Sequence, residues 1–138
     1  MVGRRDDVEA KRREKGLVRP EALHVVDKPW GRELWWAVTD RYLGKRIEVR
    51  ANHMLSLQYH REKLETLYLL SGRVRFHVDG EVLEPPIGSA LTISPGTVHR
   101  IEAVEDAVLF EVSTPHPDDV VRLDDRYGRA DQRKEGSA

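Results

Sequence analysis

The chain is short, balanced in charge and free of cysteine. It has 138 residues, 34% of them charged, and a formal net charge of −1. This length suits one domain with a sizeable core, and the charge gives no sign of nucleic acid or an anionic membrane as partner. The absence of cysteine excludes disulfides and thiolate chemistry. Because no segment resembles a bilayer span or a signal-peptide core, we expect a cytoplasmic protein.

The two ends of the chain differ in composition from its middle. Residues 1–20 interleave acidic and basic side chains, which is typical of a solvated helix or a frayed N-terminal arm. Residues 130–138 are similarly polar and predict a loose tail. We therefore expect a single domain over residues 21–129.

Short apolar stretches separated by turns fill this domain. Asp79-Gly80 is a two-residue hairpin signal between alternating stretches. About eight short strands, without a convincing interior helix, predict an all-β antiparallel sandwich or barrel. The predicted strands cover residues 34–38, 42–49, 55–60, 74–78, 82–83, 90–93, 98–104 and 107–112, with a further strand entered at Glu65.

Four polar side chains have the makeup of a metal site. Gln58 and His60 are two positions apart on an expected strand and so face the same side. Glu65 enters a strand whose alternate residues are leucine, where a buried carboxylate requires a compensating positive charge. His99 follows the turn-forming residues 94–97. Together they predict one divalent ion, with zinc, manganese, iron, nickel and cobalt all compatible. A solvent-facing strand would give the same alternation.

The spacing of residues in two stretches of the sequence resembles the motifs of a known family. The spacing from Asn52 to Gly72 resembles the first cupin motif, and that from Gly88 to His99 resembles the second. Asn52 replaces a glycine, a mild change because asparagine tolerates positive φ, and Gln58 replaces a histidine. In having glutamine at this position, the sequence resembles the type II mannose-6-phosphate isomerase domain. Further segments similar to that domain are residues 28–31, 45–49, 55–58, 94–100 and 118–129.

This resemblance implies a fold and an activity. The fold would be a small antiparallel double-stranded β-helix, the jelly-roll barrel of cupins. The activity would be metal-dependent aldose–ketose isomerisation of a sugar phosphate through an enediolate, most like that of mannose-6-phosphate isomerase. The family's domain is often fused behind a nucleotidyltransferase. The chain has no phosphate-cradling glycine loop, so we expect no nucleotidyltransferase activity from it.

Other charged residues are candidates for catalysis or sugar binding. Lys45 shares the parity of the apolar residues that follow it in its strand, so it points into the barrel near the mouth, where it could serve the enediolate or bind the sugar. Arg100, next to His99, could clamp a phosphate through its planar fork. Glu33 and Lys63 are further candidates for substrate binding. The alternative for such charges is a solvated position on the rim.

Two other functions and one assembly state also follow. The chain could be a metal-containing cupin that binds a small sugar or acid without turnover. It could also be an oxidative cupin, such as a dioxygenase. Because a small antiparallel barrel leaves edge strands and an outer apolar face, we expect a homodimer.

Overall fold

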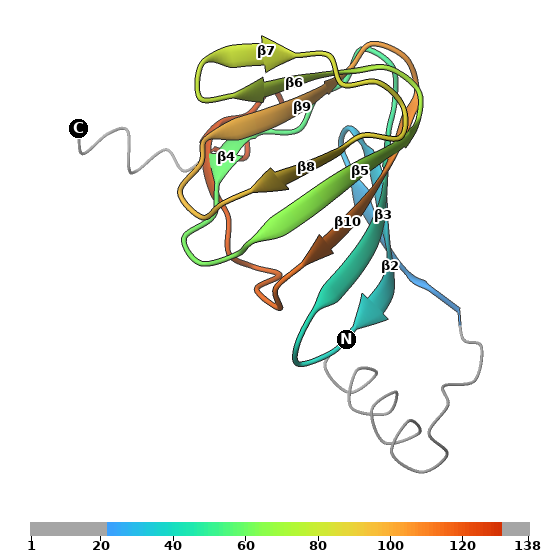
Figure 1. Cartoon of the computed structure of the whole chain (residues 1–138), viewed down its shortest axis with the longest axis vertical. Coiled ribbons are helices and arrows are strands. Elements are labelled where there is room, and N and C mark those ends of the chain that lie inside the picture. The colour runs from blue at the N-terminus through green and yellow to red at the C-terminus, as the bar shows by residue number, and fades with distance from the viewer. Residues whose placement is uncertain (1–21, 131–138) are drawn as a thin grey trace.

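The structure is a computed structural model that describes residues 22–130. Every regular element within this range is a β-strand, and the strands form two antiparallel sheets (Figure 1). The predicted all-β antiparallel architecture is therefore confirmed. The predicted N-terminal arm and all but the first residue of the predicted tail lie outside the described residues.

Sheet A has the strand order β1-β2-β3-β10-β5-β8, and sheet B has the order β11-β4-β9-β6-β7. The strands of sheet A are β1 (His24–Lys28), β2 (Gly31–Val38), β3 (Leu43–Val49), β10 (Ala107–Ser113), β5 (Glu65–Ser71) and β8 (Ala90–Ile93). The strands of sheet B are β11 (Val121–Asp124), β4 (Leu57–Tyr59), β9 (His99–Ala103), β6 (Val74–Val78) and β7 (Glu81–Leu83).

Two edge strands were missed by the sequence prediction, and one predicted strand was too long. β1 and β11 are short and carry charged residues, so their sequences lack a strong strand signal; each forms by pairing with a neighbour in the sheet. The predicted strand over residues 55–60 is shortened to the three residues of β4. His60 therefore lies just beyond the strand that carries Gln58.

The space between the sheets contains an apolar core and a polar layer beside it. In β3, Ile47 and Val49 face inward and are buried in the core. Lys45, the inward-facing residue two positions before Ile47, is also buried. The neighbouring strand β10 changes in the same way, from Leu109 in the core to the buried Glu111. Because Lys45 and Glu111 are cross-strand partners, one end of the barrel interior is lined by charge.

Two local predictions are confirmed by backbone angles. Asp79 and Gly80 have φ of 48° and 81° and connect β6 to β7, as expected for a two-residue hairpin turn. Asn52, which stands where the cupin motif has glycine, has a φ of 64°. Asparagine tolerates this left-handed conformation because its short polar side chain can bond locally.

The outer face of sheet A carries exposed large apolar side chains. They include Trp36 on β2, Tyr68 and Leu70 on β5, and Val112 on β10. Such a face is one that a second copy could cover, but the expected homodimer stays a prediction. In the described part of the chain, no helix has the length and apolar character needed to cross a membrane.

Gly72, in the turn between β5 and β6, gives a direct test of how this turn packs against the start of β10. It has a φ of +85°, and a Cβ there would collide with the backbone of Asp106 and Ala107. We expect Gly72→Ala to lower the free energy of unfolding by roughly 3 kcal/mol, from left-handed strain and overpacking together. Gly80→Ala is the matched control, because its φ is +81° but no atom lies within 4 Å. Urea denaturation measures both, and equal losses would contradict the packing argument.

Candidate metal centre

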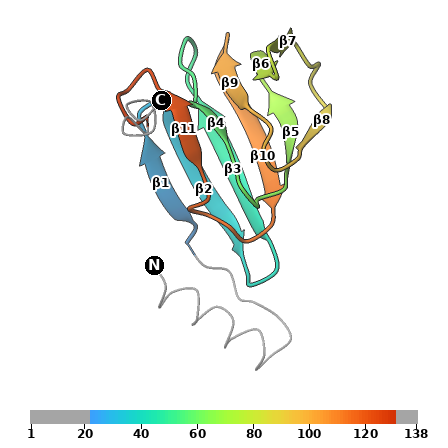
Figure 2. The same ribbon diagram turned by 90° about the vertical axis from the view of Figure 1, so that its left-hand side faces the viewer.

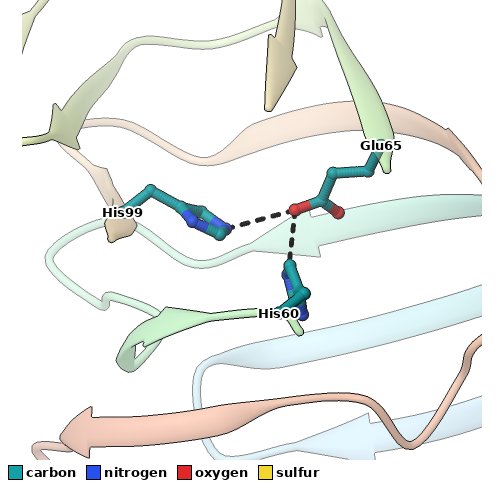
Figure 3. Close-up of side chains that lie close together, drawn as sticks. All are labelled: His60, Glu65 and His99. Carbon is teal, nitrogen blue, oxygen red and sulfur yellow. Dashed lines mark hydrogen bonds and ion pairs between the residues drawn. The ribbon is translucent and has the colours of Figure 1, made fainter. Parts of the chain in front are cut away.

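Two imidazoles converge on one buried carboxylate. Nε2 of His60 lies 3.0 Å from Oε2 of Glu65, and Nε2 of His99 lies 3.1 Å from the same oxygen (Figure 3). All three residues are at most 4% exposed. Their potential ligand atoms lie within 4.8 Å of one another. The structure therefore brings these three predicted residues together from the loop after β4 and from two strands in different sheets.

The hydrogen bonds of the two imidazoles suit a bound cation. Nδ1 of His60 lies 2.6 Å from the carbonyl oxygen of Asp119, and Nδ1 of His99 lies 2.8 Å from that of Thr97. Because a carbonyl only accepts, each Nδ1 carries the proton, and in a neutral ring Nε2 then presents a lone pair. Two lone pairs and a carboxylate facing one another fit a divalent ion, and backbone bonds of this kind orient metal-binding imidazoles.

Glu65 is kept ionised by its neighbours. Burial acts to raise the pKa of its carboxyl, but the adjacent side chains of His60 and His99 and the ammonium of Lys63 hold that pKa well below its usual range. Lys63 Nζ lies 3.3 Å from Glu65 and 3.0 Å from Glu111. Burial acts to lower the pKa of Lys63, but the two carboxylates outweigh it and raise that pKa. The candidate metal centre thus includes an anionic ligand and a buried cation that balances it.

Gln58 lies beside the three convergent residues. It is the cross-strand partner of His99 between β4 and β9, and it lines the same cavity. Its Oε1 accepts a hydrogen bond of 2.6 Å from the hydroxyl of Ser56. Its predicted part as a fourth, neutral ligand stays a prediction.

The candidate metal centre opens into a cavity of about 240 Å³ between the two sheets. All eight residues predicted for the site line it. From sheet A these are Glu33, Lys45 and Glu65; from sheet B or the loop after β4 they are Gln58, His60, Lys63, His99 and Arg100. The predicted residues are therefore brought together around one space, which is the necessary condition for a shared function.

Lys45 is fixed in the cavity wall by two neighbours. Its Nζ lies 3.5 Å from Glu33 and 4.5 Å above the ring centre of Trp35. Trp35 in turn donates a hydrogen bond of 3.0 Å to Glu33. Burial acts to raise the pKa of Glu33, but Lys45, Lys28 and this hydrogen bond together lower it, so the carboxylate is ionised at neutral pH. An ammonium and a carboxylate are thus held side by side near the metal ligands.

Arg100 has strong partners within the protein. Its Nε donates to the carbonyl of Leu55 at 2.9 Å, and Nη2 donates to the carbonyl and carboxylate of Asp124 at 3.1 and 3.2 Å. These bonds tie β9 to the end of β11. The predicted phosphate clamp at Arg100 stays a prediction, since its guanidinium already contacts three acceptors.

Asp119 is an organising residue that the sequence reasoning did not single out. Its carboxylate accepts hydrogen bonds from the backbone N–H groups of Arg61, Glu62 and Lys63 at 2.9, 2.7 and 2.9 Å. Its own carbonyl orients His60. One aspartate therefore shapes the whole loop between ligands His60 and Glu65. The only sequence signal was its place within the segment of residues 118–129 that resembles the isomerase domain.

Comparison with solved structures identifies the class of fold. An RmlC-like cupin from Shewanella frigidimarina superposes with a TM-score of 0.65 at 13% identity, covering 75% of this chain and 94% of that one. KdgF from a Halomonas species gives 0.62 at 17% identity, covering 72% and 97%. The protein therefore has the cupin fold that the resemblance implied, with the two sheets of a double-stranded β-helix.

Sequence comparison places the chain more closely. The sequence model of the family described as "Mannose-6-phosphate isomerase C-terminal" matches residues 18–125, and the chain belongs to this family. It is 35% identical over 109 residues to mannose-1-phosphate guanylyltransferase ManC of Salmonella typhimurium, covering 75% of this chain and 23% of that protein. It is 31% identical over 140 residues to xanthan biosynthesis protein XanB of Xanthomonas campestris, covering 94% and 30%. The chain thus spans less than a third of the length of these relatives.

We predict that His60→Ala and His99→Ala abolish metal-dependent stabilisation. A divalent ion at a hundred times its Kd should stabilise the wild-type protein by about 2.7 kcal/mol. Each variant should lose this gain because it removes one of few ligands. Thermal unfolding with and without zinc or manganese measures it, together with metal content after dialysis. His77→Ala is the control, because His77 contacts Glu102 instead. A variant that keeps the wild-type metal response would contradict the assignment.

We also predict that Asp119→Ala weakens metal binding without removing a ligand. Loss of three backbone hydrogen bonds should lower the free energy of unfolding by roughly 1–3 kcal/mol. The loosened loop should reduce metal affinity about 10–100-fold. Calorimetric titration with metal measures the second effect. Asp118→Ala, at the exposed neighbouring residue, should leave affinity unchanged, and equal effects of the two substitutions would refute the role of Asp119.

Proposed function

We propose that the protein is a metal-dependent aldose–ketose isomerase acting on a sugar phosphate. The observation that carries this proposal is the cavity, which joins the buried His60, Glu65 and His99 to a second set of buried charges. The family match supports it, because the family is described by a mannose-6-phosphate isomerase domain. The names of the longer relatives refer to mannose-1-phosphate guanylyltransferase and to xanthan biosynthesis, so mannose 6-phosphate is the first substrate to test.

The chemistry requires moving a proton between neighbouring carbons. A base removes the proton from the carbon beside the carbonyl, and the resulting enediolate is protonated at the other carbon. When bound, a divalent ion would supply Lewis-acid stabilisation of the developing negative charge. His60, Glu65 and His99 would hold this ion, with Gln58 as the fourth ligand. Their burial keeps water from competing at the reacting carbons.

Lys45 and the carboxylates beside it supply the remaining groups. The Lys45 ammonium, held over Trp35, would donate to an enediolate oxygen and so act only when charge develops there. Glu33 and Glu111 are the two cavity-lining carboxylates outside the ligand set that lie next to a lysine. Either carboxylate could exchange a proton with the substrate within the cavity. The positive charge of Lys63 offsets the negative charges of the buried Glu65 and Glu111.

The character of the cavity favours turnover over simple binding. A cupin that only sequesters a ligand has no need for an acid and a base beside its metal, and a sealed or apolar cavity would have supported that alternative. This cavity instead contains lysine, glutamate and arginine side chains from both sheets. Burying charged groups is unfavourable for folding, and such groups are concentrated at functional sites; their presence here therefore favours a catalytic role.

An assay of the metal-loaded protein tests the proposal. We expect interconversion of mannose 6-phosphate and fructose 6-phosphate. A coupled assay that detects either product measures it. A protein of verified metal content that isomerises neither this pair nor any aldose of a wider panel would overturn it. Consumption of dioxygen with one of these sugars would instead support the oxidative alternative.

We predict that Lys45→Met reduces kcat by a factor of about 10²–10⁴, since it removes a positioned proton donor. Metal content should not change, because Lys45 contacts Glu33 and Trp35 and none of the ligands. Arg46→Met is the matched control. It removes a cation from the next position of β3, where the side chain is 38% exposed and pairs with Glu48. Comparable losses in the two variants would show that Lys45 has no special part.

A further inference from the structure

The two edge strands that the sequence prediction missed contribute side chains to the cavity. β1 is one edge of sheet A, and β11 is one edge of sheet B. Figure 2 shows them on the same side of the barrel. Lys28 at the end of β1, Arg122 on β11 and Arg129 beyond it all line the cavity. Three cations from segments far apart in sequence thus border one space.

Lys28 is a cation that forms no ion pair with a carboxylate of the described residues 22–130. In β1 the alternate residues His24, Val26 and Lys28 are the half-buried ones, so Lys28 faces inward. Across residues 22–130, no carboxylate lies within ion-pair distance of its ammonium, although the charge of Glu33 acts on it from farther away. Burial lowers the pKa of Lys28, Glu33 partly offsets this, and Arg122, Lys45 and Arg129 lower it further. The other cations are therefore close enough to repel it.

Arg122 is aligned with the metal ligands. It is the cross-strand partner of Gln58 between β11 and β4, and Gln58 is the partner of His99 between β4 and β9. Cross-strand partners point to the same face of a sheet. Two strand spacings correspond to roughly 10 Å. A hexose with its carbonyl end at the metal ligands and a charged group at its other end spans a comparable distance.

Arg129 is held rigidly at the same place. Its Nε and Nη2 donate to the carboxylate of Asp125 at 2.8 and 3.0 Å, and the side chain of Asp125 is fully buried. Burial acts to raise the pKa of Asp125, but the bonds from Arg129 and the charges of Arg129 and Arg122 lower it. Asp125 is therefore ionised and fixes the guanidinium. Because Asp125 occupies Nε and Nη2, Arg129 would contribute to oxyanion binding through its fixed positive charge, with little loss of entropy.

Cations from distant segments gather at this end of the cavity. Lys28, Arg122 and Arg129 all line it, and the charges of Arg122 and Arg129 act on Lys28. A phosphate group, whose charge at neutral pH is about −2, would be attracted to such a group of cations. Like charges gathered in a half-buried site are unfavourable for folding unless a ligand compensates them.

We propose that Lys28, Arg122 and Arg129 form an oxyanion subsite that binds the phosphate of the ligand. The subsite rests on the proposed function only for the identity of that ligand as a sugar phosphate. It differs from the clamp predicted at Arg100, whose guanidinium is bound to Leu55 and Asp124. A sugar bearing a carboxylate has the same oxyanion chemistry, so the two sources require separate measurement.

Calorimetric titration with inorganic phosphate tests the subsite on the whole protein. We expect Lys28→Met and Arg122→Gln each to raise the Kd for phosphate about tenfold or more, because each removes a charge-assisted contact. Arg75→Gln is the matched control: it also removes one cation, but from an exposed position on β6. Lys28→Arg should largely retain binding. Thermal unfolding verifies that each variant folds. Absence of phosphate binding to the wild-type protein at millimolar concentrations, or equal Kd values for all variants, would overturn the subsite.

Titration with acetate separates the two oxyanion sources. Weaker binding of acetate than of phosphate supports the phosphate assignment. Tighter binding of acetate, weakened by the same substitutions, overturns it in favour of a carboxylate ligand.

Kinetics distinguish failure of the subsite from failure of the proposed isomerase. In Lys28→Met and Arg122→Gln, KM for mannose 6-phosphate should rise about tenfold, whereas Arg75→Gln should keep the wild-type KM; metal content should be the same in all three. Phosphate binding that the substitutions weaken, in a protein without isomerase activity, would uphold the subsite and reject the isomerase. Isomerisation with an unchanged KM in Lys28→Met and Arg122→Gln would uphold the isomerase and reject the subsite.

Discussion

The structure depends on keeping opposite charges together inside a small barrel. Lys63 lies between Glu65 and Glu111, and all three are at most 5% exposed. Removing one partner from such a buried group leaves an uncompensated charge and costs about 3–5 kcal/mol. An apolar layer would be more favourable for folding alone. The three buried charges therefore depend on one another, and none can be removed alone without a large cost.

Strand alternation is what places this layer beside a conventional core. In two neighbouring strands of sheet A the inward-facing row changes from apolar to charged: Glu65 precedes Leu67 in β5, and Glu111 follows Leu109 in β10. Because the strands are antiparallel, these charged ends lie on the same side. The apolar rows close the barrel and keep the polar row rigid, so Glu65 and His99 are held on strands that cannot move independently.

The sequence predicted what is set locally and missed what is set by pairing. The left-handed turn at Asn52 follows from neighbouring residues, as does the hairpin at Asp79-Gly80. The grouping of His60, Glu65 and His99 was predicted from strand alternation and the turn before His99, and the likeness to a known motif supported it. Asp119 was missed because its carbonyl meets His60 across 59 residues of sequence, and no local pattern records that contact. β1 and β11 were missed for the same reason: their short, charged sequences become strands only beside a partner.

The segment from Asp119 to Arg129 links the two ends of the cavity. At its start, Asp119 shapes the loop after His60 and orients the His60 ring. Farther along, Arg122 pairs with the strand of Gln58, and Arg129 is locked onto Asp125. A ligand that contacts the cations of this segment therefore acts on the same backbone that fixes a metal ligand. If the proposed subsite binds phosphate, then phosphate and metal both order the same segment of backbone, so that either ligand prepares the segment for the other. Each ligand should then increase the affinity for the other by the same factor, as linkage requires.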